Sequence, residues 1–229
     1  VFAAEFDPKI AAEFSRIHGK KTSPMDVTKV DPSRIAAENP ELLHASPVCK
    51  NCSKAKRAAT ISPEDKAIGV AVAKIIREAK PPVVTIENVP AYAGTIPHKA
   101  IMAALEDAGY TFDEVIHDAA DFGAPQTRKR LMVRAVLGGT LPPVPSPIAP
   151  GDWFTTIEDL IAAAPDEVVP PWEQGRIDNM IQRGVLSADT PIITMGGSAS
   201  SSVANARNAG GPAPTLKATP AEVPRIIMP

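Results

Sequence analysis

The sequence predicts an α/β protein with a helix-covered, parallel sheet and a second, smaller lobe. Candidate strands and helices alternate as far as Val136, a pattern typical of parallel strands joined by crossover helices. The segment 62–80 has the features of a well-defined helix, with Ser62 as its cap and acids in its first turn. From Pro142 onward the chain becomes rich in proline, which predicts a linker that leads to a different unit.

The spacing of apolar residues and capping signals sets the expected elements. Asp7 is expected to cap a helix that Gly19 ends, and Gly109 is expected to close a later one. In order, we expect strands at 1–6, 42–45, 83–87, 112–118 and 130–137, and helices at 8–18, 63–80, 97–108 and 155–165. The expected division is a core at 1–140 without its first strand, a linker and short helix at 141–165, a loop-rich lobe at 166–211, and a return to the core at 212–229.

Composition excludes several classes of protein. With 229 residues, 44% hydrophobic and 22% charged, the chain fits one globular domain with a small appended lobe. The net charge of -2 means that any site for a polyanion must be a local patch. Two cysteines exclude a disulfide framework, and no apolar run is long enough to span a membrane. We therefore expect a protein of a reducing compartment, the cytoplasm.

Three chemically capable residues come just after expected strands: Glu5, Cys49 and Glu87. In an open parallel sheet, ligands bind beyond the carboxyl ends of the strands, so these side chains are expected to face one crevice. Taken singly, each acid is equally well interpreted as a solvated loop residue. Asn88, which follows Glu87, is expected to orient a substrate or a neighbouring loop, although asparagine is also ordinary in a turn.

The pair Cys49 and Cys52 allows three interpretations. A zinc site needs four ligands, and no second pair at metal-binding spacing accompanies these thiols, so we expect no metal. A redox pair would open a helix directly after a strand. A single activated thiol is favoured because Lys50 and Lys54 are cations that lower the pKa of a nearby thiol.

The segment QTRKRLMVRA, residues 126–135, concentrates positive charge. In a strand, Arg128, Arg130 and Arg134 would share one face and would attract a carboxylate or phosphates. Gln126 adds an amide for backbone or base contact. The alternative is a charged edge of the sheet.

Together these pieces resemble the DNA cytosine-5 methyltransferases, in the order of that family. The family's catalytic cysteine loop resembles SPVCKNCSKAK, its Glu-Asn-Val element resembles IENVP, and its Gln-x-Arg-x-Arg element resembles QTRKR. Further resemblances are AAEFDP, MDV at 25–27, TTIEDLI and ARNAGGPAPTLKAT. Val48, Lys50 and Cys52 depart from the common residues of the loop, in a way that resembles members from phages and mobile elements. A nucleotide-binding α/β enzyme with a reactive thiol would not explain QTRKR together with ENV.

The resemblance implies a Rossmann-like sheet that binds S-adenosylmethionine, and a small target-recognition lobe. The Cys49 thiolate would attack C6 of a cytosine flipped out of duplex DNA, and Glu87 would protonate N3. Arg130 would hold Glu87 or the loop and Arg128 would contact the base, with these two roles exchangeable. The implied cofactor residues are Glu5, Phe6, Asp26, Val27 and Pro47, and the implied substrate residues are Ser53, Asn88, Gln126, Lys50 and Arg207.

The implied partner is double-stranded DNA, in a restriction-modification setting within a bacterial or phage-infected cell. Candidate base-edge readers are Arg176, Arg183, Asn205, Arg207 and Asn208, and candidate phosphate contacts are Lys50, Lys54, Lys56 and Arg57. The family's opening Phe-x-Gly-x-Gly turn and closing Asn-bearing element are not in the sequence. We therefore expect a chain truncated at both ends or completed by a partner chain, with weak binding of S-adenosylmethionine on its own. The alternative function is a subunit that binds DNA without turnover.

Overall fold

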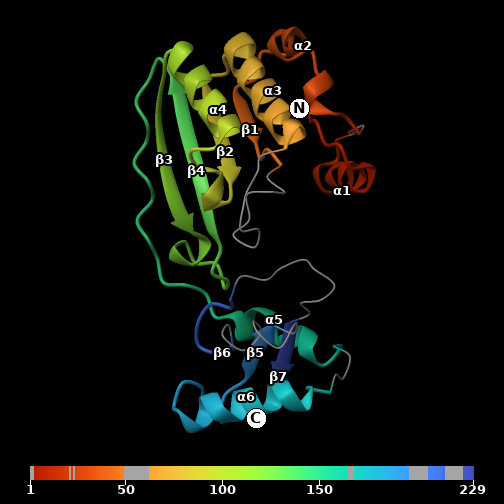
Figure 1. Ribbon diagram of the computed structural model, residues 1–229, viewed down its shortest axis with the longest axis vertical. Helices are drawn as coiled ribbons and strands as arrows, with labels where there is room; N and C mark the ends of the chain where they lie inside the picture. The colour runs from red at the N-terminus through yellow and green to blue at the C-terminus, as the bar shows by residue number, and fades with distance from the viewer. Residues whose placement is uncertain are drawn as a thin grey trace. The chain divides into compact units, whose positions relative to one another are not determined.

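The computed structural model describes residues 3–20, 22, 24–48, 62–164, 168–195, 206–214 and 224–229 (Figure 1). The chain forms two compact units. The first unit comprises Val1–Ile116 and Arg130–Val144, and the second comprises His117–Lys129 and Pro145–Pro229. The first unit ends at Val144, whereas the expected core is 1–140, and His117–Lys129 of that expected core belongs to the second unit.

The first unit is built on a four-stranded sheet in the order β1-β2-β4-β3. Its strands are β1 (Leu42–Ala45), β2 (Val83–Asn88), β3 (Tyr110–Asp118) and β4 (Lys129–Leu137). Its helices are α1 (Pro8–His18), α2 (Pro32–Ala37), α3 (Pro63–Ala79) and α4 (Ile96–Asp107), with short 3-10 turns η1 (Val27–Lys29), η2 (Pro90–Tyr92) and η3 (Ala119–Asp121) along the chain. The predicted α/β class and most predicted elements are confirmed.

The expectation of a wholly parallel sheet is wrong. β1 and β2 are parallel, but β2 and β4 run antiparallel, with Glu87 opposite Met132. The reason is the connection between β3 and β4, which contains only the turn η3 and no crossover helix. A parallel return needs a crossover of a dozen or more residues, so this short segment cannot provide one.

Helices α3 and α4 cover one face of this sheet (Figure 1). Ser62 caps α3 by accepting a hydrogen bond from the backbone N–H of Asp65, as the sequence predicts. Gly69 of α3 lies against Pro97 of α4 so closely that an added Cβ would come within 2.3 Å of the proline Cβ. This close approach lets both helices reach one apolar cluster, which comprises Val72, Ala73, Ile76, Val84, Ile86, Ile101, Ala104, Leu105, Tyr110, Val133 and Ala135.

The N-terminal segment differs from its predicted strand. Among its described residues, Glu5 makes an isolated bridge to Pro24, and Ala3 and Ala4 belong to no strand. The helix that follows is confirmed, because Asp7 accepts hydrogen bonds from the N–H groups of its first turn and Gly19 ends it at a φ of 61°. Glycine adopts that left-handed conformation without the steric cost that a Cβ imposes.

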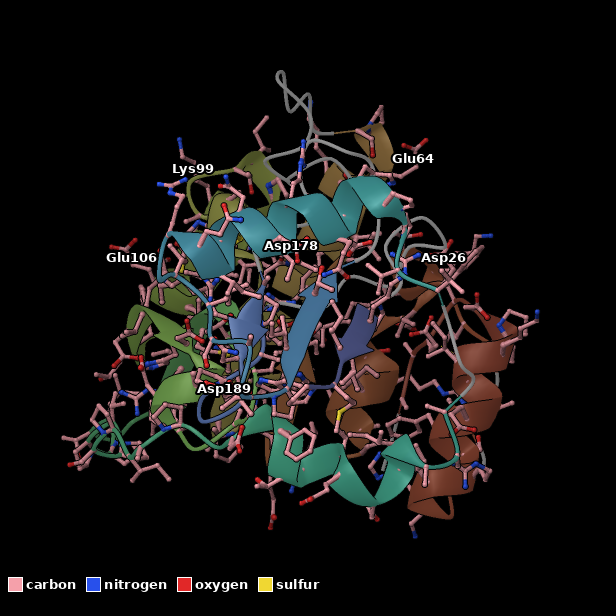
Figure 2. All side chains as sticks on the ribbon, turned by 90° about the horizontal axis from the view of Figure 1, so that it is seen from below. Asp26, Glu64, Lys99, Glu106, Asp178 and Asp189 are labelled. Atoms are coloured by element: carbon pink, nitrogen blue, oxygen red, sulfur yellow. The ribbon has the colours of Figure 1, made fainter. Side chains whose placement is uncertain are left out.

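The second unit contains a three-stranded sheet in the order β6-β5-β7. Its strands are β5 (Ile192–Met195), β6 (Arg207–Asn208) and β7 (Pro224–Ile227), and its helices are α5 (Trp153–Ile161) and α6 (Pro171–Gln182). The sheet lies between the two helices (Figures 1 and 2). Ile192 packs with Ile177 of α6, while the next residue, Ile193, packs with Trp153 of α5. Alternation along β5 therefore joins both helices to the same strand.

Two features of the second unit differ from the predicted organisation. The sequence predicts a loop-rich segment at 166–211, yet this segment contains the helix α6. Asp178, labelled in Figure 2, belongs to this helix. Only Glu173 and Ile177 of this helix are buried, so its apolar periodicity is too weak to predict it. The sequence also predicts that 212–229 returns to the core, and the described part of this segment instead contributes β7 to the second sheet.

A buried ion pair ties α6 to the small sheet. Glu173 is fully buried, and its Oε2 lies 2.9 Å from Nη1 of Arg225 on β7. Its Oε1 accepts a hydrogen bond of 2.7 Å from the Thr194 hydroxyl on β5. A buried carboxylate needs such partners because desolvation penalises an unpaired charge.

Within the described part of the chain, no helix has the length and apolar character needed to cross a membrane.

Candidate active site

Parallel pairing of β1 with β2 brings two predicted motifs together. Ala45 is opposite Ile86 in the register, so Ser46 and Pro47 leave the sheet beside Glu87 and Asn88. The chain that follows Pro47 leads towards the cysteine loop, and Glu87 belongs to the Glu-Asn-Val element. The described residues thus bring Ser46 and Pro47 beside the Glu-Asn-Val element. The expected position of Cys49 beside Glu87 stays a prediction.

The carboxylate of Glu87 is held on both of its oxygens. Nε of Arg130, on β4, lies 2.7 Å from Oε1 of Glu87. The Ser46 hydroxyl donates a 2.9 Å hydrogen bond to Oε2. The expected contact between Arg130 and Glu87 is thus observed, and the arginine has the carboxylate partner that its position in a central strand suggested. With 28% of its side chain exposed, Glu87 is fixed in orientation and still accessible to a ligand.

Asn88 positions the start of the cysteine loop. Its side chain is buried, and its Nδ2 donates a 2.8 Å hydrogen bond to the carbonyl of Pro47. Its Oδ1 accepts a hydrogen bond from the N–H of Val89. Of the two roles that the sequence allows, this geometry favours the orientation of a neighbouring loop. Direct contact of Asn88 with a substrate stays a prediction.

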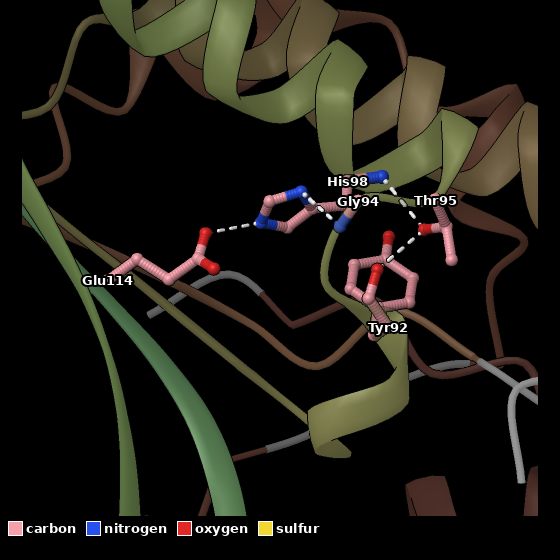
Figure 3. A network of polar contacts seen from close by, with 5 residues as sticks. All are labelled: Tyr92, Gly94, Thr95, His98 and Glu114. Carbon is pink, nitrogen blue, oxygen red and sulfur yellow. Dashed lines mark hydrogen bonds and ion pairs between the residues drawn. The ribbon is translucent and has the colours of Figure 1, made fainter. Parts of the chain in front are cut away.

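The turn that follows Glu87 is braced by a network around His98 (Figure 3). Nδ1 of His98 accepts a hydrogen bond of 3.1 Å from the N–H of Gly94, which leaves the ring proton on Nε2. Nε2 lies 2.6 Å from Oε2 of Glu114 on β3. The Thr95 hydroxyl donates to the Tyr92 carbonyl and caps α4 through the His98 N–H. These contacts fix the backbone between β2 and α4, and with it the end of the strand that carries Glu87.

Arg134 occupies the same face of β4 as Arg130, and it also pairs with a carboxylate. Its guanidinium forms an ion pair with Asp113 of β3 and donates to the carbonyl of Pro142. The hydrogen bond with Asp113 raises the pKa of Arg134. Arg130 and Arg134 therefore both pair with carboxylates, one of the two kinds of anion that the sequence suggested for them.

The two acids among the predicted cofactor residues, Glu5 and Asp26, lie on neighbouring segments. The carbonyl of Glu5 accepts a 2.7 Å hydrogen bond from the N–H of Met25, which brings Glu5 beside Asp26 along the chain. Oε1 of Glu5 accepts from the N–H of Asp7, and Oδ1 of Asp26 accepts from the N–H and hydroxyl of Thr28. The Thr28 hydroxyl and N–H lower the pKa of Asp26. Both carboxylates are half-buried, and their contact with a cofactor stays a prediction.

The other predicted cofactor residues have different environments. Phe6 is 75% exposed beside Glu5, so its ring is accessible to a ligand. Val27 begins η1 and is half-buried. Pro47 is buried, and its observed contact is the carbonyl that Asn88 anchors. Cofactor contact at these three positions stays a prediction.

Arg128 and Gln126 lie in the second unit, next to the segment 211–214. Gln126 forms a parallel bridge with Ala213, and the N–H of Thr127 donates to the Ala213 carbonyl. The N–H of Arg128 donates a 2.7 Å hydrogen bond to Oδ1 of Asp118, while its side chain is exposed. The structure thus joins the QTRKR element to the GPAP sequence that resembles a later family segment.

The candidate base-edge readers of the second unit are not equivalent. Arg207 is exposed and donates to its neighbour's carbonyl, at Ala206. The side-chain amide of Asn208 forms hydrogen bonds with Ser187 and Thr190, in the turn before β5. Arg176 is exposed and lies 5.9 Å from the centroid of the Trp172 ring. Arg176 and Arg207 are therefore exposed while the Asn208 amide is engaged within the unit, and contact of any of them with a base stays a prediction.

The cysteine loop from Cys49 onward lies outside the described residues. This applies to the predicted nucleophile Cys49, to Lys50 and Ser53, and to the phosphate candidates Lys54, Lys56 and Arg57. It applies also to Asn205. No group of three or more potential metal ligands occurs in the part of the chain that the structure describes.

Sequence reasoning missed Ser46 as a partner of Glu87. The signal was available, because parallel strands that end at 45 and 88 place the residues that follow β1 against the end of β2. The sequence offers His44 only as a histidine near the two cysteines. In the structure its Nδ1 lies 2.9 Å from Oγ1 of Thr85, its partner in the register of β1 and β2.

A family model described as C-5 cytosine-specific DNA methylase matches residues 1–182. Among curated proteins, Type II methyltransferase M.MspI of Moraxella sp is 34% identical over 145 residues, which cover 60% of this chain and 33% of that protein. Type II methyltransferase M.NlaX of Neisseria lactamica is 28% identical over 171 residues, covering 73% of this chain and 53% of that protein. The chain thus spans about a third to a half of the curated relatives that it matches.

Solved structures agree on the fold. The Entamoeba histolytica methyltransferase EhMeth superposes with a TM-score of 0.58 at 18% identity, covering 81% of this chain and 57% of that one. The S. pombe Dnmt2 methyltransferase superposes with a TM-score of 0.53 at 20% identity, covering 62% and 43%. The expected Rossmann-like methyltransferase fold is confirmed by these neighbours.

Proposed function

Since the chain belongs to the C-5 cytosine-specific DNA methylase family, we propose that it methylates C5 of cytosine in double-stranded DNA. The observation that carries the proposal is the carboxylate of Glu87, held by Arg130 and Ser46 at the strand end beside the start of the cysteine loop. A family member needs a carboxyl group at this place, because cytosine becomes reactive at C5 only when its N3 is protonated or hydrogen-bonded. The substrate class, the cofactor and the residue roles below are parts of this proposal.

The covalent step is assigned to Cys49. Its thiolate adds to C6 of the base while Glu87 gives a proton to N3, so that electron density develops at C5. S-adenosylmethionine supplies the methyl group when it is bound. Loss of the C5 proton and release of the thiolate then restore the aromatic ring. A base stacked in a duplex cannot reach such a group, so the reaction requires a flipped cytosine.

The remaining residues bind and orient. Arg130 keeps Oε1 of Glu87 fixed, so that Oε2 is the oxygen that can face N3. Glu5 and Asp26 would accept hydrogen bonds from the ribose hydroxyls and the adenine amine of the cofactor, with Phe6, Val27 and Pro47 around them. Arg128 would contact the base, Lys50, Ser53 and Gln126 would contact the DNA, and Arg207 would contact a base edge. Type II methyltransferases among the relatives are consistent with a restriction-modification role.

The experiment that tests this function is covalent trapping. The protein is incubated with duplex DNA that contains 5-fluorocytosine, whose fluorine prevents the final elimination. S-adenosylmethionine is added at saturating concentration, because the chain is expected to bind it weakly. We expect an adduct that survives denaturing electrophoresis and that is lost in Cys49→Ser. A matched Cys52→Ser variant should still form the adduct, since Cys52 is assigned no role. DNA binding without any adduct would overturn the proposal in favour of a non-catalytic DNA-binding subunit.

A further inference from the structure

A row of polar side chains runs along the junction of β1 and β2 and ends at Glu87. Oγ1 of Thr85 lies 2.9 Å from Nδ1 of His44, and Nε2 of the same ring lies 3.5 Å from Oγ of Ser46. The Ser46 hydroxyl then donates its 2.9 Å hydrogen bond to Oε2 of Glu87. By strand alternation this row is on the face opposite to Ile86, which packs under α3 and α4. The contact of 3.5 Å is the longest link, at the outer limit of a hydrogen bond.

The hydrogen bonds of this row have one direction. Ser46 has a single hydroxyl proton, which it donates to Glu87, so its oxygen can only accept from the His44 ring. His44 therefore presents Nε2–H towards Ser46. Its other nitrogen, Nδ1, either accepts from Thr85 or donates to it when the ring is protonated. Each donor from His44 onward thus points towards Glu87.

The proposed reaction requires a proton on Glu87, and the resting arrangement does not provide it. Both oxygens of Glu87 accept hydrogen bonds, from Arg130 and from Ser46, as those of a carboxylate do. A flipped base that binds against Glu87 would separate it from bulk water. His44 is an exposed residue separated from Glu87 by Ser46, so it can exchange protons with solvent while the base covers Glu87.

From this geometry we propose that His44 and Ser46 form a proton relay that supplies Glu87. The Nε2 proton of the His44 imidazolium moves to Oγ of Ser46, while the Ser46 hydroxyl proton moves to Oε2 of Glu87. The step leaves a neutral imidazole and a neutral carboxylic acid, with no change in the number of protons or electrons. The reverse transfer accepts the proton when N3 releases it. The inference rests on the proposed function, because it explains how Glu87 becomes an acid.

The test measures the single-turnover rate of adduct formation on duplex DNA containing 5-fluorocytosine, with S-adenosylmethionine present. We expect Ser46→Ala to slow adduct formation by about 100-fold, within the usual range for general acid–base catalysis. Ser46→Thr, which keeps the hydroxyl, should stay within about threefold of the wild type. His44→Ala should be about 10-fold slower, and added imidazole should restore much of the rate because the vacated position is open to solvent.

Further variants distinguish a relay from a purely structural role of Ser46. Thr85→Val removes only the outer hydrogen bond and should change the rate by less than about threefold. The DNA dissociation constant and the melting temperature of the His44 and Ser46 variants should match those of the wild type, because both residues are exposed. A fast His44→Ala variant beside a slow Ser46→Ala variant would overturn the relay and leave Ser46 as a positioning residue. A slow His44→Ala variant that imidazole does not restore would also overturn it, and a wild-type protein that forms no adduct would instead refute the proposed function.

Discussion

The two faces of the four-stranded sheet use the same strands for opposite purposes. The face under α3 and α4 is apolar and buried, with Val84 and Ile86 of β2 and Val133 of β4 inside one cluster. The opposite face carries Thr85 and Glu87 of β2, and Arg130 of β4, as half-buried polar groups. Because side chains alternate along a strand, one six-residue strand contributes both to the core and to the candidate site.

The difference shows which contacts should control stability and which should control chemistry. Apolar burial contributes free energy roughly in proportion to area, whereas partly exposed ion pairs contribute little. Substitutions on the apolar face should therefore change unfolding, and substitutions on the polar face should change reaction rates. Two predictions test this division, and two more test the packing of the apolar face.

The largest expected effect is on the apolar face. Ile86 is 1% exposed, and Ile86→Ala should lower the free energy of unfolding by about 2–5 kcal/mol, because it removes buried methyl groups and leaves a cavity. Its neighbour Thr85 points to the other face, and Thr85→Ala should cost less than about 1 kcal/mol. Urea denaturation of both variants measures the two values. Equal losses would contradict the division between the faces.

On the polar face, Arg130→Gln should reduce the rate of the proposed methylation by about 100-fold, because Glu87 loses the group that fixes Oε1. The free energy of unfolding should fall by less than about 1 kcal/mol, since both side chains are partly exposed. A matched control is Arg77→Gln, which breaks the exposed pair with Asp107 and should leave the rate unchanged. A similar loss of rate in Arg77→Gln would contradict the specific role of the Arg130–Glu87 ion pair.

The packing of α3 against α4 gives a third test. Gly69→Ala should destabilise the protein by about 1–3 kcal/mol, because the new Cβ would meet the backbone and ring of Pro97. Gly175 of α6 has open space around it, so Gly175→Ala should instead stabilise its helix by about 0.5–1 kcal/mol. Denaturation monitored by circular dichroism can compare them. A stable Gly69→Ala variant would show that the two helices can move apart.

The smallest effect concerns Tyr110, at the edge of the apolar cluster. Burial raises its pKa from the ordinary value of 10.0 to about 12, and its hydroxyl donates to the Pro81 carbonyl. Because the pKa of Tyr110 is raised in the folded protein, its contribution to the free energy of unfolding is fully present below about pH 10 and is lost as the pH rises through about 12. At pH 9 the free energy of unfolding of the wild type should therefore exceed that of Tyr110→Phe by on the order of 1 kcal/mol. This difference should shrink as the pH increases. An advantage that grows with pH would contradict the assigned sign.

The sequence was informative where local rules decide structure. The cap Asp7, the cap Ser62 and the terminal Gly19 predicted helix ends that the structure confirms, since these signals act within one turn. It was less informative where partners come from afar. Nothing local indicates that β4 runs antiparallel to β2, or that Glu173 of α6 will be buried against Arg225 of β7.

The same distinction applies to the site. The order of short motifs determined the family, and it singled out Glu87, Asn88 and Arg130 as candidates, because each motif retains its residue types at fixed spacing. Only the tertiary structure decided their partners. The parallel register of β1 and β2 brings Ser46 to Glu87 and Pro47 to Asn88, and the antiparallel return of β4 brings in Arg130. These contacts join residues about forty positions apart, so they depend on strand pairing, which no local pattern specifies.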